Sequence, residues 1–189
     1  MAILTGINKV KTAVFISGNG SNLKSLIKFS KTKKSPISID FIISNNSKAK
    51  GLRYAKLFKI NKRVFNFKDK NLIEKKLLSI FKKNKINLIC LAGFMKILSK
   101  NFIKKFKGKI LNIHPSLLPK YKGLKTHNRV LNNREKYSGC TVHFVNNKLD
   151  SGEIIMQKKV KISKKETEAS LAKKILAQEH KLYPKAIIK

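Results

Sequence analysis

Two residues with complementary hydrogen-bonding chemistry stand close together in the segment NIHPSLLPKYKG, which spans residues 112–123. Asn112 and His114 are two positions apart at the expected end of a strand, so alternation places both side chains on the same side of the chain. A carboxamide and an imidazole aimed at one point suit the stabilisation of a developing oxyanion with a proton transfer nearby. Pro115 and Pro119 stiffen the loop that follows. The alternative for His114 alone is a hydrogen-bonded structural histidine.

Asp150 is the carboxylate that could complete such a site. The chain has only nine acidic residues, and Asp150 lies in the segment LDSG, which comes after the strand-like run CTVHFV. A carboxylate beside an imidazole favours the charged ring and fixes its orientation. Asp-Ser-Gly is also good turn chemistry, so a plain turn former is the other interpretation. Spacing in the sequence does not decide whether Asp150 meets His114.

A glycine-containing loop, ISGNGSNL at residues 16–23, follows an expected strand and opens an expected helix. Glycines allow the backbone to approach an anion, and the free N–H groups of a helix start bind phosphate. The side chains of Ser21 and Asn22 can add hydrogen bonds or cap the helix. A tight turn with an N-cap is the alternative. The loop matches neither the dinucleotide fingerprint nor the Walker loop, which disfavours nucleoside-triphosphate chemistry.

Alternating short apolar runs and amphipathic segments surround these residues and indicate the fold. We expect strands at residues 12–17, 37–44, 63–67, 86–91, 109–113, 141–145 and 153–162, and helices at 21–29, 48–58, 71–82 and 166–183. The helix at 71–82 would place Leu72, Ile73, Leu77, Leu78, Ile80 and Phe81 on its apolar side. This alternation predicts an α/β fold with a mostly parallel twisted sheet, helices on both faces and antiparallel strands toward the C-terminal part.

The residues singled out above would meet at one edge of that sheet. Residues 18–22, 93–98 and 112–119, together with Asp150, all fall at the carboxyl ends of expected strands. In open α/β sheets, ligands bind at these ends. The sequence therefore predicts one site assembled from several strand ends.

Length and composition favour one domain over residues 1–189. No repeat or long linker divides the chain, and its longest mostly apolar stretch, residues 86–95, is too short to cross a bilayer. The first residues lack the pattern of a secretion signal. Cys90 and Cys140 stand far apart, without a second Cys or His at a metal-ligand spacing, and read as small buried residues in a reducing compartment. We expect a cytoplasmic protein with no membrane partner.

The formal net charge of +35 raises the possibility of a nucleic-acid partner. Nucleic-acid surfaces usually cluster arginine and stacking aromatic residues. Here only four arginines occur, and lysines are spread almost evenly along the chain. We therefore expect a solvated lysine surface and no specific nucleic-acid partner, although this charge attracts anionic small molecules.

Five segments in a fixed order carry a resemblance to a known family. They are ISGNGSNL, LAGFMKILS, NIHPSLLPKYKGLKTH, TVHFV with LDSG, and QEHKLYP, and together they extend from residue 12 to about residue 184. This set resembles the phosphoribosylglycinamide formyltransferases, a folate-dependent family of purine synthesis with a Rossmann-like α/β fold. No single segment is specific, but their combination is.

The resemblance implies a role for each matching residue. The catalytic trio would be Asn112, His114 and Asp150. The phosphate of the ribonucleotide substrate would bind to Gly20, Ser21 and Asn22. Its glycinamide would bind to Glu179, and Leu176, Ala177 and Gln178 would line that region. The folate would contact Lys70, Met95, Lys96, Ile97, Leu98 and Asn112, and the loop Asn146, Asn147, Lys148, Leu149 and Asp150 would close over its pterin. The implied co-substrate is 10-formyltetrahydrofolate, without a metal, in a monomer or homodimer.

Three departures from the family pattern concern the folate contacts and the chain end. Lys70 and Lys96 stand where many relatives have arginine, and lysine lacks the bidentate fork. The chain also ends at Lys189, whereas many relatives have a longer tail. We expect weaker folate contacts and an unaltered trio.

The rival functions are of two kinds, related folate enzymes and a binding module without chemistry. Related transformylases that act on initiator methionyl-tRNA share Asn-x-His but carry a further C-terminal domain and lack the GNGSNL loop. Formyltetrahydrofolate hydrolases usually have an N-terminal regulatory domain. A lysine-rich nucleic-acid-binding module without chemistry is a rival from another class, and it leaves Asn112, His114 and Asp150 unexplained.

Overall fold

A seven-stranded sheet is the centre of the computed structural model, which describes residues 9–189. Its strands are β1 (Val10–Ile16), β2 (Ile37–Ser44), β3 (Asn61–Val64), β4 (Leu88–Leu91), β5 (Lys109–His114), β6 (Tyr137–Phe144) and β7 (Ile154–Lys161), in the order β3-β2-β1-β4-β5-β6-β7. The first five strands are parallel to one another. Strand β6 is antiparallel to β5, and β7 is antiparallel to β6. The predicted mixed sheet with antiparallel C-terminal strands is confirmed.

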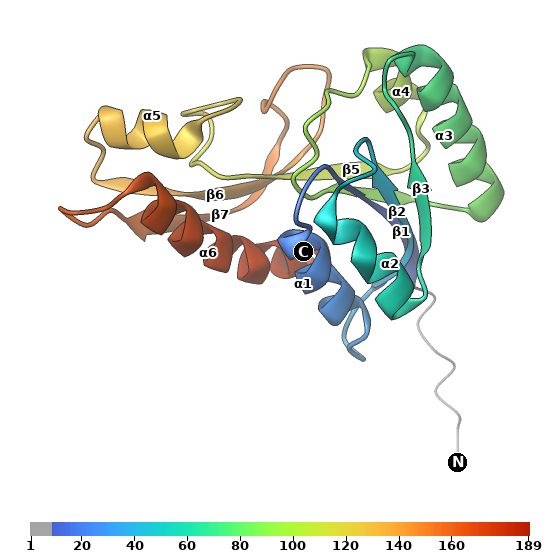
Figure 1. The fold of residues 1–189 in the computed structure, drawn as a ribbon, viewed down its shortest axis with the longest axis horizontal. Helices are drawn as coiled ribbons and strands as arrows, with labels where there is room; N and C mark the ends of the chain where they lie inside the picture. Colours follow the sequence, from blue (N-terminus) through green and yellow to red (C-terminus); the bar gives the residue numbers. More distant parts are fainter. Residues whose placement is uncertain (1–8) are drawn as a thin grey trace.

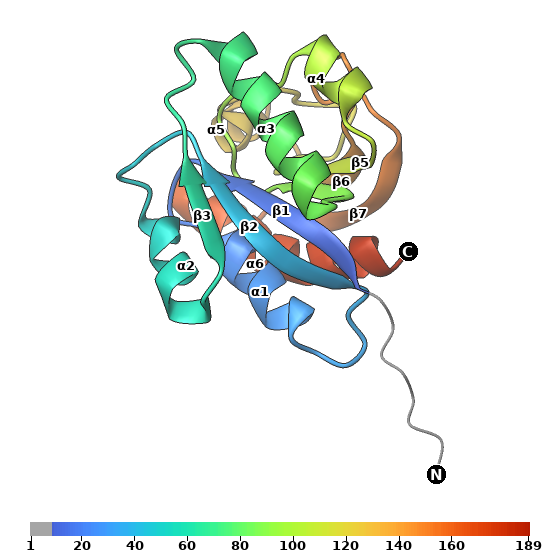
Figure 2. The ribbon, with the colours of Figure 1, turned by 90° about the vertical axis from the view of Figure 1, so that its right-hand side faces the viewer.

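Helices cover both faces of this sheet (Figures 1 and 2). They are α1 (Ser21–Ser30), the 3-10 turn η1 (Lys50–Leu52), α2 (Arg53–Phe58), α3 (Lys70–Asn84), α4 (Lys100–Lys105), α5 (Thr126–Asn132) and α6 (Glu168–Ile188). Figure 2 shows α1, α2 and α6 on one face and α3 and α4 on the other. Each face therefore has its own layer of packed side chains.

Strand β1 shows how one sequence serves both layers. Val14 and Ile16 pack with the α1–α6 layer, whereas Ala13 and Phe15 pack with the α3–α4 layer. Successive side chains of a strand point to opposite faces, so a strand buried on both sides must be apolar without interruption. All four side chains are fully buried, and the end of β1 is consequently a rigid support for the loop that follows it.

Several element boundaries differ from those that the sequence predicts. Helices α4 and α5 were not predicted, because six and seven residues give too little periodicity to recognise. Strand β3 pairs at Asn61–Val64 instead of residues 63–67, since Phe65 and Phe67 leave the strand to pack in the α3–α4 layer. Leu72, predicted on the apolar side of α3, is 47% exposed in the first turn of that helix.

The C-terminal helix is longer than predicted. The sequence predicts a helix over residues 166–183, whereas α6 begins at Glu168, passes through Pro184 and continues to Ile188. Tyr183 and Ala186 are both buried, and the Tyr183 hydroxyl donates to the carbonyl oxygens of Leu91 and Leu111. Packing on the sheet thus outweighs the local cost of the proline.

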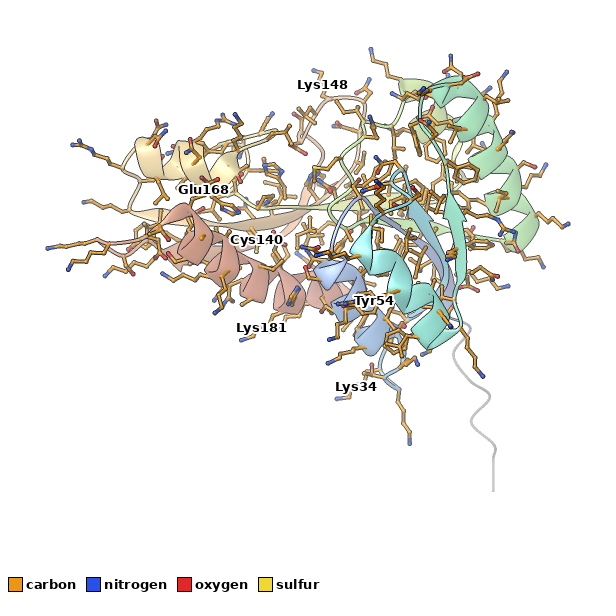
Figure 3. The ribbon with its side chains drawn as sticks, in the orientation of Figure 1. Lys34, Tyr54, Cys140, Lys148, Glu168 and Lys181 are labelled. Atoms are coloured by element: carbon orange, nitrogen blue, oxygen red, sulfur yellow. The ribbon has the colours of Figure 1, made fainter. Side chains whose placement is uncertain are left out.

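The many lysines lie on the surface of the molecule (Figure 3), and the two cysteines lie in its interior. Figure 3 shows lysine side chains, including Lys34 and Lys181, extending outward on many sides of the molecule. Both cysteines, Cys90 and Cys140, are buried and unbridged, as predicted. Within residues 9–189, no helix combines the length and apolar character that a membrane crossing requires.

Candidate active site

A cleft of about 790 Å³ opens at the carboxyl ends of the parallel strands. It is lined by residues 18–22 after β1, 91–98 after β4, 112–115 at the end of β5, 123–127 before and in α5, 143 and 145–150 around the end of β6, and by Ala172, Leu176 and Glu179 of α6. The cleft thus lies at the strand ends where the sequence predicts a site.

The three residues of the expected trio meet in this cleft. The His114 Nδ1 and Asp150 Oδ2 atoms are 3.4 Å apart, and the two side chains are 6% and 8% exposed. The Asn112 Nδ2 atom donates to Asp150 Oδ1 at 3.5 Å. Asn112 and His114 are brought to one side by the alternation of β5, and the loop after β6 returns Asp150 to them.

Each ring nitrogen of His114 faces an acceptor group. Its Nε2 atom lies 2.8 Å from the carbonyl oxygen of Tyr121, which can only accept a hydrogen bond. Its Nδ1 atom faces the Asp150 carboxylate, which is also an acceptor. Both ring nitrogens are therefore directed at acceptors, the Tyr121 carbonyl oxygen on one side and the Asp150 carboxylate on the other.

Asp150 is fixed by the backbone as well as by its side chain. Its Oδ2 atom accepts the N–H of Gly123 at 2.9 Å, which leaves the carboxylate oriented toward His114. Its backbone is in the left-handed region, with φ 44°, a conformation that Asp tolerates better than most residues. The turn interpretation and the catalytic interpretation of Asp150 are therefore compatible.

His143 also belongs to this cluster, although the sequence argument assigned it no role. It lies opposite Asn112 in the β5–β6 register, and its side chain is 2% exposed. Its Nδ1 atom donates to the Phe144 carbonyl oxygen at 2.7 Å, so in the neutral ring Nε2 accepts the Asn112 Nδ2–H at 3.2 Å. Burial lowers the pKa of His143, against the opposing effects of the Phe144 hydrogen bond and Asp150. A polar residue at an inward position of the apolar strand TVHFV is the signal that could have revealed it.

The glycine loop starts α1 without a side-chain cap. Gly20 is the N-cap residue, with φ 70°, and neither Ser21 nor Asn22 caps the helix. Of the two alternatives for Asn22, a cap or another hydrogen bond, the structure has the second, because its Nδ2 atom donates to Glu179 Oε2 at 2.7 Å. A Cβ atom on Gly20 would lie 2.7 Å from the Cα atom of Gly51. Close packing of two backbones thus requires glycine and leaves the first N–H groups of α1 at the cleft.

Glu179 brings a buried carboxyl group to the same end of the cleft. It is 6% exposed, and burial raises its pKa to about 7, while the hydrogen bond from Asn22 acts in the opposite direction. The Asn22 Oδ1 atom is buried and has no hydrogen-bond partner among residues 9–189. An amide oxygen and a carboxyl group are therefore adjacent in a region able to bind a ligand with N–H donors.

Most of the other predicted contact residues line the cleft, and three do not. Met95 and Ile97 form an exposed apolar rim, 62% and 67% accessible, while Leu98 is buried. Lys96, Leu176 and the loop Asn146, Asn147, Lys148 and Leu149 also contribute to the lining. Lys70 at the start of α3 and Ala177 and Gln178 of α6 lie outside it.

Comparison with known proteins identifies relatives over almost the whole chain. Residues 10–187 match the formyl transferase family. Phosphoribosylglycinamide formyltransferase of Haemophilus influenzae is 41% identical over 180 residues, which cover 94% of this chain and 85% of that protein. The crystal structure of phosphoribosylglycinamide formyltransferase from Brucella melitensis superposes with a TM-score of 0.89 at 40% identity and covers 95% of this chain and 94% of the other.

A longer protein also contains a matching region. The trifunctional purine biosynthetic protein adenosine-3 of Homo sapiens is 42% identical over 182 residues. The match covers 95% of this chain but only 18% of the human protein. Taken with the family match and the bacterial relatives, it shows that the chain belongs to the formyl transferase family and, within that family, to the phosphoribosylglycinamide formyltransferases.

Proposed function

We propose that this protein transfers the formyl group of 10-formyltetrahydrofolate to the amine of phosphoribosylglycinamide in the synthesis of purines. The observation that carries the proposal is the meeting of Asn112, His114 and Asp150 in a cleft that also contains the glycine loop at the start of α1. Its relatives are named for the same reaction. A transfer-RNA acceptor is not favoured, because these relatives are named for a small substrate, phosphoribosylglycinamide.

The ribonucleotide would bind between the glycine loop and α6. Its phosphate would accept hydrogen bonds from the N–H groups of Gly20, Ser21 and Asn22, where the dipole of α1 also favours a negative charge. Its glycinamide would lie beside Glu179, whose carboxyl group is already oriented by Asn22. The amine would consequently point toward the trio.

The folate would occupy the opposite side of the cleft. We assign its pterin to the segment of Met95, Lys96, Ile97 and Leu98 and to the loop of Asn146, Asn147, Lys148 and Leu149. The apolar rim of Met95 and Ile97 is suited to an aromatic ring system, and exposed lysines are suited to the carboxylates of the folate tail. The formyl group would then lie between the trio and the glycinamide amine.

The reaction would proceed by direct transfer. The amine nitrogen attacks the formyl carbon, so a C–N bond forms and the carbonyl oxygen becomes an oxyanion. The positive ring of His114 and the amide hydrogens of Asn112 stabilise this oxyanion, while Asp150 keeps the ring charged and oriented. The proton lost by the amine is relayed, with the help of Asp150, to N10 of the folate as the bond between N10 and the formyl carbon breaks.

His143 would act through Asn112. It accepts one amide hydrogen of Asn112 in its neutral form, so it fixes which way the carboxamide faces. We assign it a positioning role, because its own ring is held against the backbone of Phe144. We further propose that residues 1–189 form a single domain, which acts in the cytoplasm as a monomer or homodimer.

The direct test is an assay of the purified protein with 10-formyltetrahydrofolate and phosphoribosylglycinamide. We expect release of tetrahydrofolate that depends on the ribonucleotide. Water alone should give little release, and methionyl-tRNA should not replace the ribonucleotide. Release without any amine acceptor would indicate a hydrolase and would overturn the proposal.

A further inference from the structure

One side chain outside the cleft lining joins the two loops that we assign to the two substrates. Ser17 follows β1 directly and precedes the glycine loop at residues 18–22. Its Oγ atom accepts the backbone N–H of Met95 at 2.8 Å. The same hydroxyl donates to Oδ1 of Asn45, which follows β2. Ser17 thus connects the ends of three neighbouring strands at the floor of the site.

The backbone and the side chain of Ser17 make separate hydrogen bonds. Its N–H donates to the Gly93 carbonyl oxygen at 3.0 Å, and its carbonyl oxygen accepts from Asn46 Nδ2 at 3.2 Å. These bonds fix where the glycine loop begins, and they do not depend on the side chain. Only the hydroxyl is hydrogen-bonded to Met95. A substitution of the Ser17 side chain therefore removes this bond and leaves the backbone bonds to Gly93 and Asn46 in place.

The loop that includes Met95 has few other polar attachments. Among residues 9–189, the bond from Met95 N–H to Ser17 Oγ is the only hydrogen bond made by residues 94–98. Packing of Phe94 against Phe15 and burial of Leu98 anchor side chains of this loop. Neither contact sets the direction of the backbone groups between them, which leaves that task to Ser17.

Asn45 makes the hydroxyl of Ser17 directional. A serine hydroxyl has one hydrogen and two acceptor lone pairs. Since the hydrogen is directed to Asn45 Oδ1, a lone pair is left facing the Met95 N–H. The chain Asn45–Ser17–Met95 therefore has a defined polarity from the end of β2 to the folate side of the cleft.

We propose that Ser17 is a positioning residue for folate binding, which holds the segment of Met95, Lys96, Ile97 and Leu98 in its binding conformation through the Met95 amide. This inference rests on the proposed function, because it takes that segment as the folate contact. Loss of the hydroxyl leaves the segment free to adopt other conformations, which folate must then reorder on binding. The ribonucleotide loop keeps its own backbone bonds and is little affected.

The test compares Ser17→Ala with the wild-type enzyme in steady-state kinetics. We expect the KM for 10-formyltetrahydrofolate to rise about tenfold, the scale of one positioned hydrogen bond. The KM for phosphoribosylglycinamide should change less than about twofold. Hydrogen exchange followed by mass spectrometry, without substrates, should show faster exchange in the peptide that contains Met95 and unchanged exchange in α1.

Variants of Asn45 and of a distant serine provide the controls. Asn45→Ala removes the acceptor and should raise the folate KM in the same direction, whereas Asn45→Asp retains an acceptor and should stay nearer the wild type. Ser38→Ala removes only a hydrogen bond to Asp40 on β2 and should change neither KM.

Two outcomes would overturn the positioning role. They are equal increases in both KM values and an unaltered exchange rate around Met95 in Ser17→Ala. If the wild-type enzyme released no tetrahydrofolate, the proposed function would fail instead. The exchange measurement would still report whether Ser17 holds the loop.

Discussion

The two histidines of the site occupy opposite electrostatic environments within one cluster. His114 faces an acceptor at each ring nitrogen, whereas His143 has one nitrogen committed to a backbone carbonyl and the other to the Asn112 amide. Acceptors thus surround the first ring, whereas burial lowers the pKa of the second. The site therefore places an imidazole with an acceptor at each nitrogen beside an oriented amide, and in the proposed reaction these two groups stabilise the oxyanion.

Glu179 provides a prediction about pH at the scale of one residue. Its pKa is raised from 4.5 to about 7 by burial, so the folded state binds more protons than the unfolded state between these values. The free energy of unfolding must then fall as pH rises through this window. The full penalty, on the order of 3 kcal/mol, is present above pH 7.

The variant Glu179→Gln removes this titration and keeps an acceptor for Asn22. We expect it to be more stable than the wild type at pH 8 by up to about 3 kcal/mol, with the difference vanishing near pH 4.5. Urea unfolding at a series of pH values measures the difference directly. A stability difference that does not vary with pH would show that Glu179 titrates alike in the folded and the unfolded protein, so that its pKa is not raised.

The start of α1 provides the test at the scale of an element. Gly20→Ala puts a Cβ atom at φ +70° and 2.7 Å from the Gly51 backbone. We expect a loss of about 1–2 kcal/mol in stability from the left-handed conformation alone. The displaced loop should raise the KM for phosphoribosylglycinamide at least about tenfold and that for the folate much less.

The same loop contains its own control. A Cβ atom on Gly18 would have nothing within 4 Å, so Gly18→Ala should alter the free energy of unfolding by less than about 0.5 kcal/mol. Urea unfolding and both KM values are to be measured for the two variants together. Equal increases of the two KM values in Gly20→Ala would show that the glycine loop is not part of the ribonucleotide site.

Elements with long patterns were predictable from the sequence, and short ones were not. The strand at Ile37–Ser44 and the helix α3 carry enough apolar residues at the right period to be placed almost to the residue. Helix α4 is held mainly by the buried Phe102 and the Ser99 cap, which only the packed structure reveals. The placement of sites at strand ends was predictable because parallel strands share one carboxyl edge.

Contacts that depend on tertiary packing could not be read from the sequence. The Tyr121 carbonyl oxygen reaches His114 because the loop after β5 folds back over the site. The pairing of Asn22 with Glu179 joins the first and the last helix. Asn22 and Glu179 are each expected at the substrate site from the sequence. The sequence does not give the distance between them, and it does not show that Asn22 is already hydrogen-bonded to Glu179.

At the scale of the whole molecule, the excess of cations is mostly unpaired. The chain has 44 lysines and arginines against nine acidic residues, and residues 9–189 contain two ion pairs that do not involve histidine. Such a surface attracts any polyanion through counterion release. It gives no sequence preference, because the few arginines form no pattern suited to bases.

We therefore expect weak binding to DNA and RNA that does not depend on sequence. Fluorescence anisotropy with labelled oligonucleotides should show a steep, linear fall of log K with the logarithm of the salt concentration. Transfer RNA should behave like other RNA of equal length. Tight binding of one RNA at physiological salt would favour a transfer-RNA substrate over the small ribonucleotide.

The unit formed by Asn112, His114 and Asp150 is tested most directly by a double-mutant cycle on kcat. Asp150→Asn keeps the shape of the side chain and removes the charge that faces His114 at 3.4 Å. We expect a folded protein, nearly unchanged KM values and a kcat lower by about two orders of magnitude or more.

His114→Asn should be similarly damaging, and the double variant should be little worse than either single one, because the two groups act together. The measurement is single-turnover transfer from 10-formyltetrahydrofolate to phosphoribosylglycinamide by all four proteins. Rate losses that multiply in the double variant, or an Asp150→Asn enzyme that retains most of its kcat, would contradict this account.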